Sequence, residues 1–239
     1  VFQEPMSTLN PLLPIGFQVA ESLRLHKNFS RHQSQQHASK VLDRVGLQSH
    51  KYSRSLYPHQ LSGGQRQRVV IAIAMACGPE LIIADEPTTA LDVTIQAQIL
   101  DLIAELVFEE NMSLILITHN LGIVAENTDH MLVMYAGNIV ESGPTKNVFE
   151  KLVHPYTRGL FSSIPNLRVP NTGKGLQSKY SQINRLPTIP GRVPEFWERS
   201  KGCSFVDRCP RAQANCSSKF PELIQLGTAH STTCFFPYE

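Results

Sequence analysis

Apolar residues recur at helical spacing in four stretches of the chain, with polar residues between them. The four stretches are residues 16–28, 30–45, 66–76 and 94–110. A spacing of three or four residues places apolar side chains on one face of an α-helix, where they pack against a core. The pattern therefore predicts four helices, and the third begins directly after a segment with two adjacent glycines.

Two short runs of consecutive apolar residues alternate with these helices. The first, residues 81–84, stops at Asp85, and the second, residues 113–117, stops at Thr118. Runs of this length are typical of strands that are buried on both faces. A strand, a helix and another strand in this order predict a parallel crossover unit and hence an α/β fold. Two later runs, at 131–135 and 138–142, predict a hairpin.

The composition is that of an ordinary globular protein. The chain has 239 residues, of which 41% are hydrophobic and 18% charged, and its net charge is +2. These values exclude a disordered chain and a coiled-coil rod. The longest wholly apolar run, residues 69–77, is about half of the roughly 20 residues that a membrane helix needs. The weak positive charge does not predict binding to nucleic acid.

Two carboxylates follow the first predicted strand directly. Asp85 and Glu86 would lie at its carboxyl end. A nucleotide hydrolase needs one carboxylate there to hold Mg²⁺ through its water shell and a second to polarise the attacking water. Acidic pairs also occur in solvated loops, so this pair alone leaves both interpretations open.

The segment before the third helix predicts a site where a helix N-terminus binds an anion. Its two glycines let backbone amides approach an anion, and the helix directs its unpaired N–H groups and positive dipole end at the same place. A serine hydroxyl adds a donor. A plain helix-entry turn is the alternative interpretation. The residues of this segment are Leu61, Ser62, Gly63, Gly64 and Gln65.

In their order along the chain, these motifs resemble the ATP-binding cassette (ABC) family. Residues 61–65 match its signature motif, and residues 81–85 match its Walker B strand. The resemblance implies an α/β P-loop NTPase cassette with a helical subdomain, here expected at about residues 12–78. It also implies that Asp85 binds the Mg²⁺ of ATP and that Glu86 is the catalytic carboxylate.

Three further positions carry the same resemblance. Gln3 is similar to the Q-loop glutamine, Asp92 to the D-loop aspartate, and His119 to the switch histidine after the next strand. A histidine at a strand end can donate a hydrogen bond to the γ-phosphate of ATP. In this family two cassettes pair head to tail, so that each signature motif completes the partner's ATP site.

A phosphate-binding P-loop, Gly-x-x-x-x-Gly-Lys-Ser/Thr, does not occur in the 239 residues. In the family it lies upstream of the Q-loop, and the first residue here is Val1. We therefore expect an ABC domain at residues 1–165 that lacks its Walker A part and, as written, binds ATP poorly at its own Walker B edge. Two functions follow: an ATPase subunit in the complete protein, or a truncated, non-hydrolysing cassette that donates its signature motif to an intact partner.

Other segments resemble the ATP-binding subunits of bacterial dipeptide and oligopeptide importers. They are residues 3–11, 154–160, 190–194, 202–203 and 208–210. The last three resemble the C-terminal extension of this subfamily, here expected at residues 166–239. The resemblance implies a peripheral protein on the cytoplasmic face of the inner membrane. Its implied partners are a distinct second cassette, two transmembrane permease subunits and, indirectly, an extracytoplasmic solute-binding protein, whereas the cargo stays open.

Four of the five cysteines lie in the last part of the chain. Clustered thiols in a chain without a secretory signal favour metal or cluster ligation over disulfides. Their spacing, C-x5-C-x6-C-x17-C, matches neither a zinc ribbon nor a plant-type ferredoxin, so it leaves a cluster, zinc or free thiols open. The resemblance implies a [4Fe–4S] cluster. The four residues are Cys203, Cys209, Cys216 and Cys234.

Overall fold

The chain forms two compact units, Val1–Ile123 and Val124–Glu239. The boundary predicted between residues 165 and 166 lies outside the described residues, so the two expected domains stay a prediction. None of the helices in the described ranges is long and apolar enough to cross a membrane. The structure is a computed structural model that describes residues 1–164, 187–227 and 229–239.

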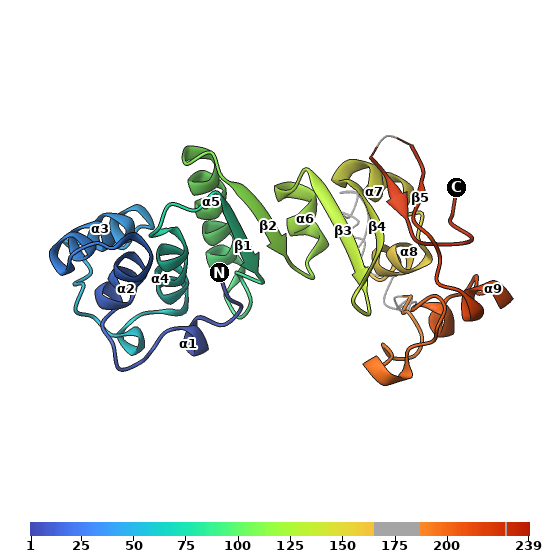
Figure 1. The fold of residues 1–239 in the computed structure, drawn as a ribbon, viewed down its shortest axis with the longest axis horizontal. Helices are drawn as coiled ribbons and strands as arrows, with labels where there is room; N and C mark the ends of the chain where they lie inside the picture. Colours follow the sequence, from blue (N-terminus) through green and yellow to red (C-terminus); the bar gives the residue numbers. More distant parts are fainter. Residues whose placement is uncertain (165–186, 228) are drawn as a thin grey trace, which may run out of the picture. The chain divides into compact units, whose positions relative to one another are not determined.

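The first unit begins with a group of helices. Helices α2 and α3 pack against each other, and both contact α4 (Figure 1). The predicted helices of this region are confirmed, while the extent of a helical subdomain at 12–78 stays a prediction. The elements are α1 (Pro5–Thr8), α2 (Ile15–Lys27), α3 (Arg31–Arg44), the 3₁₀ helix η1 (Pro58–Gln60) and α4 (Gly63–Met75).

Helix α4 begins at Gly63 rather than at residue 66 because Ser62 caps it. Ser62 Oγ accepts a hydrogen bond from the Gln65 backbone N–H at 3.3 Å, and Gln65 Oε1 accepts one from the Ser62 N–H at 2.9 Å. This capping box satisfies two donors that a helix N-terminus otherwise leaves unpaired. Both glycines therefore lie in the first turn of the helix.

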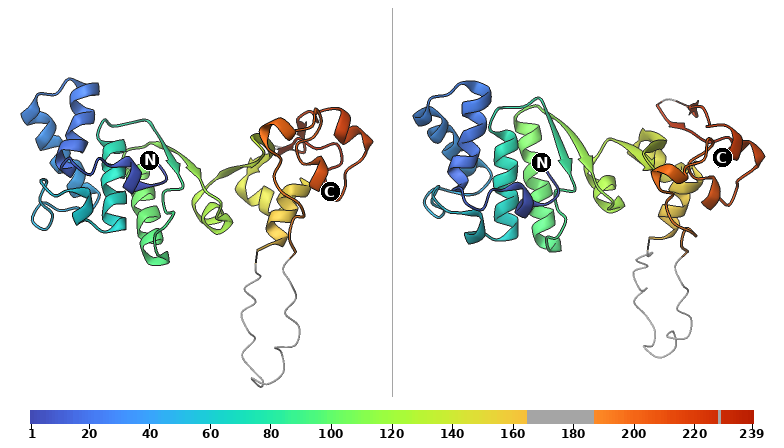
Figure 2. Two further views of the ribbon diagram at one scale, coloured as in Figure 1. Left: turned by 90° about the horizontal axis from the view of Figure 1, so that it is seen from below. Right: turned by 60° about the horizontal axis from the view of Figure 1, so that its bottom comes forward.

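A parallel strand pair follows, as predicted. Strand β1 (Leu81–Asp85) is joined to β2 (Ser113–Ile117) through helix α5 (Val93–Glu109). The two strands pair in register from Leu81 with Ser113 to Asp85 with Ile117. Helix α4 lies between the α2–α3 pair and α5, as the views of Figure 2 show.

The expectation that both strands are buried on both faces is wrong for this structure. In β1, Ile82 and Ala84 are buried, whereas Leu81 and Ile83 expose 45% and 50% of their surface. Ile115 of β2 is 47% exposed. One face of the strand pair packs on the helices, and in the first unit as described no layer covers the other face.

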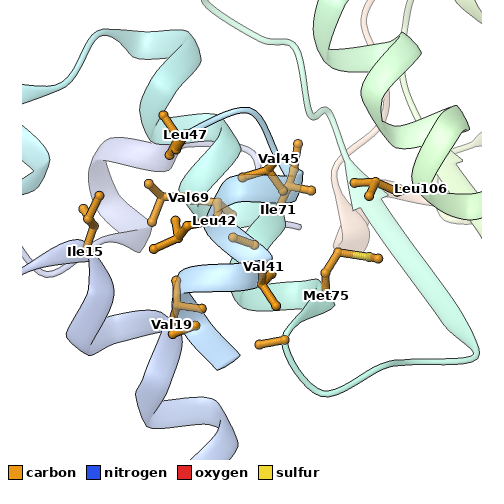
Figure 3. Packing of buried hydrophobic residues seen from close by; sticks show 14 of the residues in the cluster. Ile15, Val19, Val41, Leu42, Val45, Leu47, Val69, Ile71, Met75 and Leu106 are labelled. Atoms are coloured by element: carbon orange, nitrogen blue, oxygen red, sulfur yellow. The ribbon is translucent and has the colours of Figure 1, made fainter. Parts of the chain in front are cut away.

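The core of the first unit joins α2, α3, α4 and α5 to the buried face of β1. Ile15 and Val19 of α2 meet Leu42 of α3 and Val69 of α4 in one cluster, and Leu106 of α5 joins it (Figure 3). These residues expose at most 3% of their surface. The helical spacing of apolar residues in the sequence is therefore accounted for by a single shared core.

The second unit is built around an antiparallel sheet. Strands β3 and β4 form the predicted hairpin, in which Ala136 and Gly137 have φ of 47° and 80°, the left-handed conformation of a type I′ turn. The sheet order is β3-β4-β6-β5, so the C-terminal segment adds two short strands to the hairpin. The strands are β3 (His130–Tyr135), β4 (Asn138–Pro144), β5 (Ile224–Gln225) and β6 (Ser231–Thr232).

The second unit also contains short helices, of which α7 contacts β3 and β4. Phe205 is 2% exposed, and its ring packs edge-on against Tyr135 and Tyr156 at centroid distances of 5.0 and 5.4 Å. The helices are α6 (Leu121–Asn127), which crosses the boundary between the units, α7 (Thr145–Lys151), α8 (Pro155–Ser162), η2 (Phe196–Glu198), η3 (Val206–Arg208) and α9 (Ala214–Ser218).

Candidate active site

The ends of β1 and β2 bring the predicted catalytic residues to one edge of the strand pair. Glu86 follows β1 directly, and its backbone N–H donates to the Ile117 carbonyl at the end of β2 at 2.9 Å. His119 lies two residues further along. The N-terminal segment runs beside β1, because the Asp85 N–H donates to the Val1 carbonyl at 2.9 Å. The same edge therefore also receives Gln3.

The Glu86 carboxylate is the centre of a hydrogen-bonded network in the first unit. Its Oε2 accepts from Gln3 Nε2 at 3.1 Å and from Thr89 Oγ1 at 2.6 Å. Its Oε1 lies 2.9 Å from His119 Nδ1. The structure thus brings together three residues that the sequence places 83 and 33 positions apart.

These contacts lower the pKa of the Glu86 carboxyl group. The hydrogen bond from Thr89 is the main cause that lowers the pKa of Glu86, and the contact with His119 adds to it. The Glu86 side chain is 22% exposed and that of His119 is 79% exposed, so solvent reaches the network. Glu86 also has φ of 44°, an unusual conformation for a residue with a side chain. An ionised, oriented and accessible carboxylate is suited to activate a water molecule.

Asp85 lies next to this network without being part of it. Its side chain is exposed and makes none of the hydrogen bonds or ion pairs described for residues 1–164. It interacts electrostatically with the N-terminal ammonium group of Val1. An exposed carboxylate that accepts no hydrogen bond from the protein can hold the water shell of Mg²⁺.

The signature-motif residues form a tightly packed helix start. A Cβ atom at Gly64 would lie 2.7 Å from Ile95 Cγ2, and one at Gly63 would lie 3.3 Å from Leu91 Cδ2. Leu61 is buried beneath the turn. Gly64 is therefore required by its close packing against α5, and Gly63 lies in tight contact with the loop before α5; the sequence did not reveal this reason.

Asp92 acts as the N-cap of α5. Its Oδ1 accepts from the Ile95 N–H at 2.9 Å. Gln96 Nε2 donates to the carbonyls of Thr88 and Leu91, at 3.2 and 3.1 Å, and so holds the preceding loop against the helix. The segment that resembles the D-loop is thus fixed from α5.

The four tail cysteines line one cavity of the second unit, together with aromatic residues. Three of their sulfurs accept a backbone N–H two residues ahead: Cys203 from Phe205, Cys209 from Arg211 and Cys234 from Phe236. Burial raises the pKa of the Cys234 thiol to about 11. Among the described residues, no three His, Cys, Asp or Glu side chains are placed to hold a single metal ion.

Two family models match the sequence. The ABC transporter model matches residues 3–89, and the model of the oligopeptide/dipeptide transporter C-terminal region matches residues 140–216. A Brucella melitensis protein with the name "peptide import ATP-binding protein" is 49% identical over 234 residues, which are 98% of this chain and 68% of the relative. The chain belongs to the ATP-binding proteins of ABC transporters.

A second relative of this ABC chain, a Brucella abortus protein of the same name, is 47% identical over 98% of the chain and 67% of its own length. Among solved structures, CbiO1 of Clostridium perfringens, part of an ABC transporter complex, matches with a TM-score of 0.55 and 29% identity over 63% of this chain and 58% of that one.

A dimeric ATP-binding cassette bound to ADP and Pi matches this ABC chain with a TM-score of 0.52 and 29% identity, over 61% of each chain. The chain therefore spans less than two thirds of these two solved cassettes. These matches confirm the predicted α/β cassette fold, and the family agrees with the prediction of ATP and Mg²⁺ as ligands.

Sequence reasoning missed one residue at the centre of this ABC site. The sequence analysis assigned Asp92 to the D-loop, but the hydrogen bond from Thr89, three residues before it, to Glu86 was not foreseen. The signal was available, since a hydroxyl three residues after a carboxylate in a tight turn reaches back to it.

Proposed function

We propose that this chain is the ATP-hydrolysing subunit of a bacterial peptide importer. The observation that carries the proposal is the network in which the carboxylate of Glu86 joins Gln3 and His119 at the carboxyl edge of the strand pair. The two Brucella relatives, which cover the chain almost completely, are named for peptide import.

Each residue of the edge takes one role in hydrolysis. Glu86 is the general base for the attacking water, and its low pKa keeps it ionised at neutral pH. His119 donates a hydrogen bond to the γ-phosphate, which supports the charge that develops there. Asp85 binds Mg²⁺ through water, and Gln3 orients water or metal beside Glu86.

The signature residues serve a partner's nucleotide. The first N–H groups of α4, at Gly63 and Gly64, stand at the positive end of the helix and suit a phosphate. Ser62 Oγ accepts from Gln65 N–H, which leaves its own proton free to donate. Leu61 anchors the turn, and Asp92 holds the neighbouring loop.

The alternative, a non-hydrolysing cassette that only donates its signature motif, is not favoured. Glu86 keeps its hydrogen bond from Thr89 and its contact with His119. A subunit that hydrolyses ATP requires such a base, whereas a subunit that only contributes its signature motif does not. The P-loop is not among these 239 residues. Assays of hydrolysis therefore use the full open reading frame.

We further propose the assembly in which the subunit acts. It pairs with a second, distinct ABC subunit and docks from the cytoplasmic face of the membrane onto two permease subunits. An extracytoplasmic solute-binding protein delivers the peptide, and nucleic acid has no part in this function. The match to the oligopeptide/dipeptide transporter C-terminal region supports this assignment.

We also propose that Cys203, Cys209, Cys216 and Cys234 hold a [4Fe–4S] cluster. All four line one cavity, and three accept the backbone N–H···S bonds that stabilise thiolates. A cluster takes one thiolate on each of four irons, so its ligands stand further apart than those of a single ion. When bound, it supplies one-electron chemistry and a cross-link for a small tail.

Iron and acid-labile sulfide in anaerobically purified protein test the cluster. Equal amounts of both, near four per chain, are expected. Zinc without sulfide, or neither element above background, would remove the cluster from the proposal.

Peptide uptake tests the transport function. The full-length chain is reconstituted with its permeases, partner cassette and binding protein in vesicles, and uptake of labelled di- and oligopeptides is measured with and without ATP. His119→Ala should lower ATP-driven uptake by about 100- to 1000-fold because a phosphate donor is lost. His50→Ala is the matched control, since His50 is exposed in a turn outside the site. Hydrolysis without peptide uptake would contradict the proposal.

A further inference from the structure

His154 lines the cysteine cavity, and although it is the first residue of the segment 154–160, it has been given no role so far. It is 1% exposed, although histidine is a polar residue. It is the N-cap of α8, because its Nδ1 accepts a hydrogen bond from the Tyr156 N–H at 3.0 Å. Its ring packs 6.0 Å from that of Phe205.

The cap fixes the tautomer of this imidazole. Since Nδ1 accepts a hydrogen bond, it carries no proton, and the ring proton lies on Nε2. Within the part of the chain that the structure describes, no hydrogen bond of Nε2 is found. Nε2 is not among the fully buried polar atoms that lack a partner in the described chain, so protein atoms do not cover it completely. Its N–H is therefore available to a group bound in the cavity that His154 lines.

The Glu141 carboxyl group fixes the backbone at His154 through hydrogen bonds. Glu141 of β4, which is fully buried, accepts the N–H of His154 at 2.9 Å and that of Val153 at 3.2 Å. His230 Nε2 lies 3.0 Å from the same carboxyl group and is 1% exposed. The imidazole thus has a fixed position as well as a fixed tautomer.

Sulfur is the acceptor that this cavity offers. Its lining is otherwise mainly aromatic and apolar, and its other charged side chain, Arg211, lies over the Tyr238 ring at 4.4 Å. The four thiols are the remaining polar groups. Bound thiolate and sulfide are good acceptors for an N–H, and such hydrogen bonds stabilise the extra negative charge of a reduced cluster.

We propose that His154 is a positioning residue of the cysteine centre, whose Nε2–H donates a hydrogen bond to a cluster sulfur or a ligand thiolate and raises the reduction potential. This inference rests on the proposed [4Fe–4S] cluster. It assigns to the histidine at the start of α8 a second role besides capping.

Two substitutions separate the cap from the donor. In His154→Asn the amide oxygen takes the place of Nδ1 and keeps the cap, but no N–H reaches the place of Nε2. In His154→Gln the amide nitrogen reaches the place of Nε2, and the cap is lost. The comparison uses the full-length protein, purified anaerobically, with equal iron and sulfide content in all three forms.

The readout is a redox titration followed by electron paramagnetic resonance. In His154→Asn the ratio of reduced to oxidised cluster at a fixed ambient potential should fall, on the order of tenfold, which is about 59 mV for one electron. His154→Gln should stay near the wild-type value. Equal potentials in all three forms, or a shift in His154→Gln alone, would overturn the inference.

The wild-type protein gives a test that needs no variant. With ¹⁵N-labelled histidine, the reduced cluster should show a weak nitrogen coupling and an exchangeable proton in double-resonance spectra. Absence of the coupling contradicts the role of His154 even when the cluster is present. Absence of iron and sulfide from the wild type would instead remove the cluster proposal, and this inference with it.

Discussion

Each of the two units contains a close pair of glutamate and histidine, and the two pairs differ in burial. In the first unit Glu86 lies 2.9 Å from His119, and their side chains are 22% and 79% exposed. In the second, Glu141 lies 3.0 Å from His230, and their side chains are 0% and 1% exposed. Similar contacts thus occur in very different surroundings.

The difference in burial indicates that the Glu86–His119 pair has a chemical role and that the Glu141–His230 pair has a structural one. An exposed pair contributes little to stability, because water competes for both partners, and it can rearrange around a substrate. A buried carboxyl group must have all its partners satisfied, because each lost hydrogen bond leaves a desolvated polar group. Glu86 is therefore free to act on a ligand, whereas Glu141 ties β4 to the start of α8.

The largest expected effect is on stability, at Glu141. Glu141→Gln turns an amide NH₂ toward backbone N–H groups that need an acceptor. We expect the free energy of unfolding to fall by about 3 kcal/mol. Urea denaturation measures the loss, and hydrogen exchange at the Val153 and His154 amides locates it.

The matched control is Glu86→Gln, the same substitution in the exposed pair. It should change the free energy of unfolding by less than about 0.5 kcal/mol. The two variants are compared at equal iron content. If both lose the same free energy of unfolding, burial does not distinguish the two pairs.

The next effect concerns the packing beneath the polar groups of the first unit. Gly64→Ala places a methyl group 2.7 Å from Ile95 Cγ2, so the start of α4 or the side chain must move. We expect a destabilisation of about 2 kcal/mol in thermal or urea unfolding. Gly63→Ala, whose new methyl group would lie 3.3 Å from Leu91, should cost less.

A double-mutant cycle with Ile95→Ala sharpens this prediction. When the isoleucine is truncated, the added methyl group at residue 64 has room, and its cost should largely vanish. If Gly64→Ala costs the same in both backgrounds, the close contact with α5 is not the reason for the glycine.

The smallest effect is on the titration of Glu86. The hydroxyl of Thr89 is the main cause of its lowered pKa, so Thr89→Val should raise the pKa toward the ordinary glutamate value. The carboxylate then takes up its proton at a higher pH. Carbon-13 NMR of the Glu86 carboxyl group measures this shift, and Thr89→Ser should restore the wild-type titration.

Much of the exposed site could be predicted from the sequence. Asp85, Glu86 and His119 follow apolar runs, and the carboxyl ends of parallel strands meet at one edge of a sheet. The resemblance added Gln3, which no local pattern would have placed beside Glu86. The hydroxyl three residues after Glu86 was a signal for the hydrogen bond of Thr89, whereas the positive φ at Glu86 in the loop after β1 has no simple sequence pattern.

The buried cluster of the second unit could not be predicted. Glu141 is a charged residue in a short hairpin strand, between Val140 and Ser142, and charged residues are mostly exposed to solvent. Its burial depends on β6, a strand of two residues far along the chain, in which Thr232 pairs with Glu141 and Ser231 with Ser142. The opposite error was made for β1, where residues expected to be buried are exposed. A continuous apolar run does not indicate which face of the strand the described chain covers.

The most direct test of the account is the rate of ATP hydrolysis by the assembled transporter with Glu86→Gln. The account predicts a loss of about 1000-fold or more with ATP still bound, because the general base is removed and the shape is kept. Glu80→Gln, an exposed glutamate just before the other end of β1, should hydrolyse ATP normally. A wild-type rate in Glu86→Gln would contradict the assignment of the catalytic carboxylate.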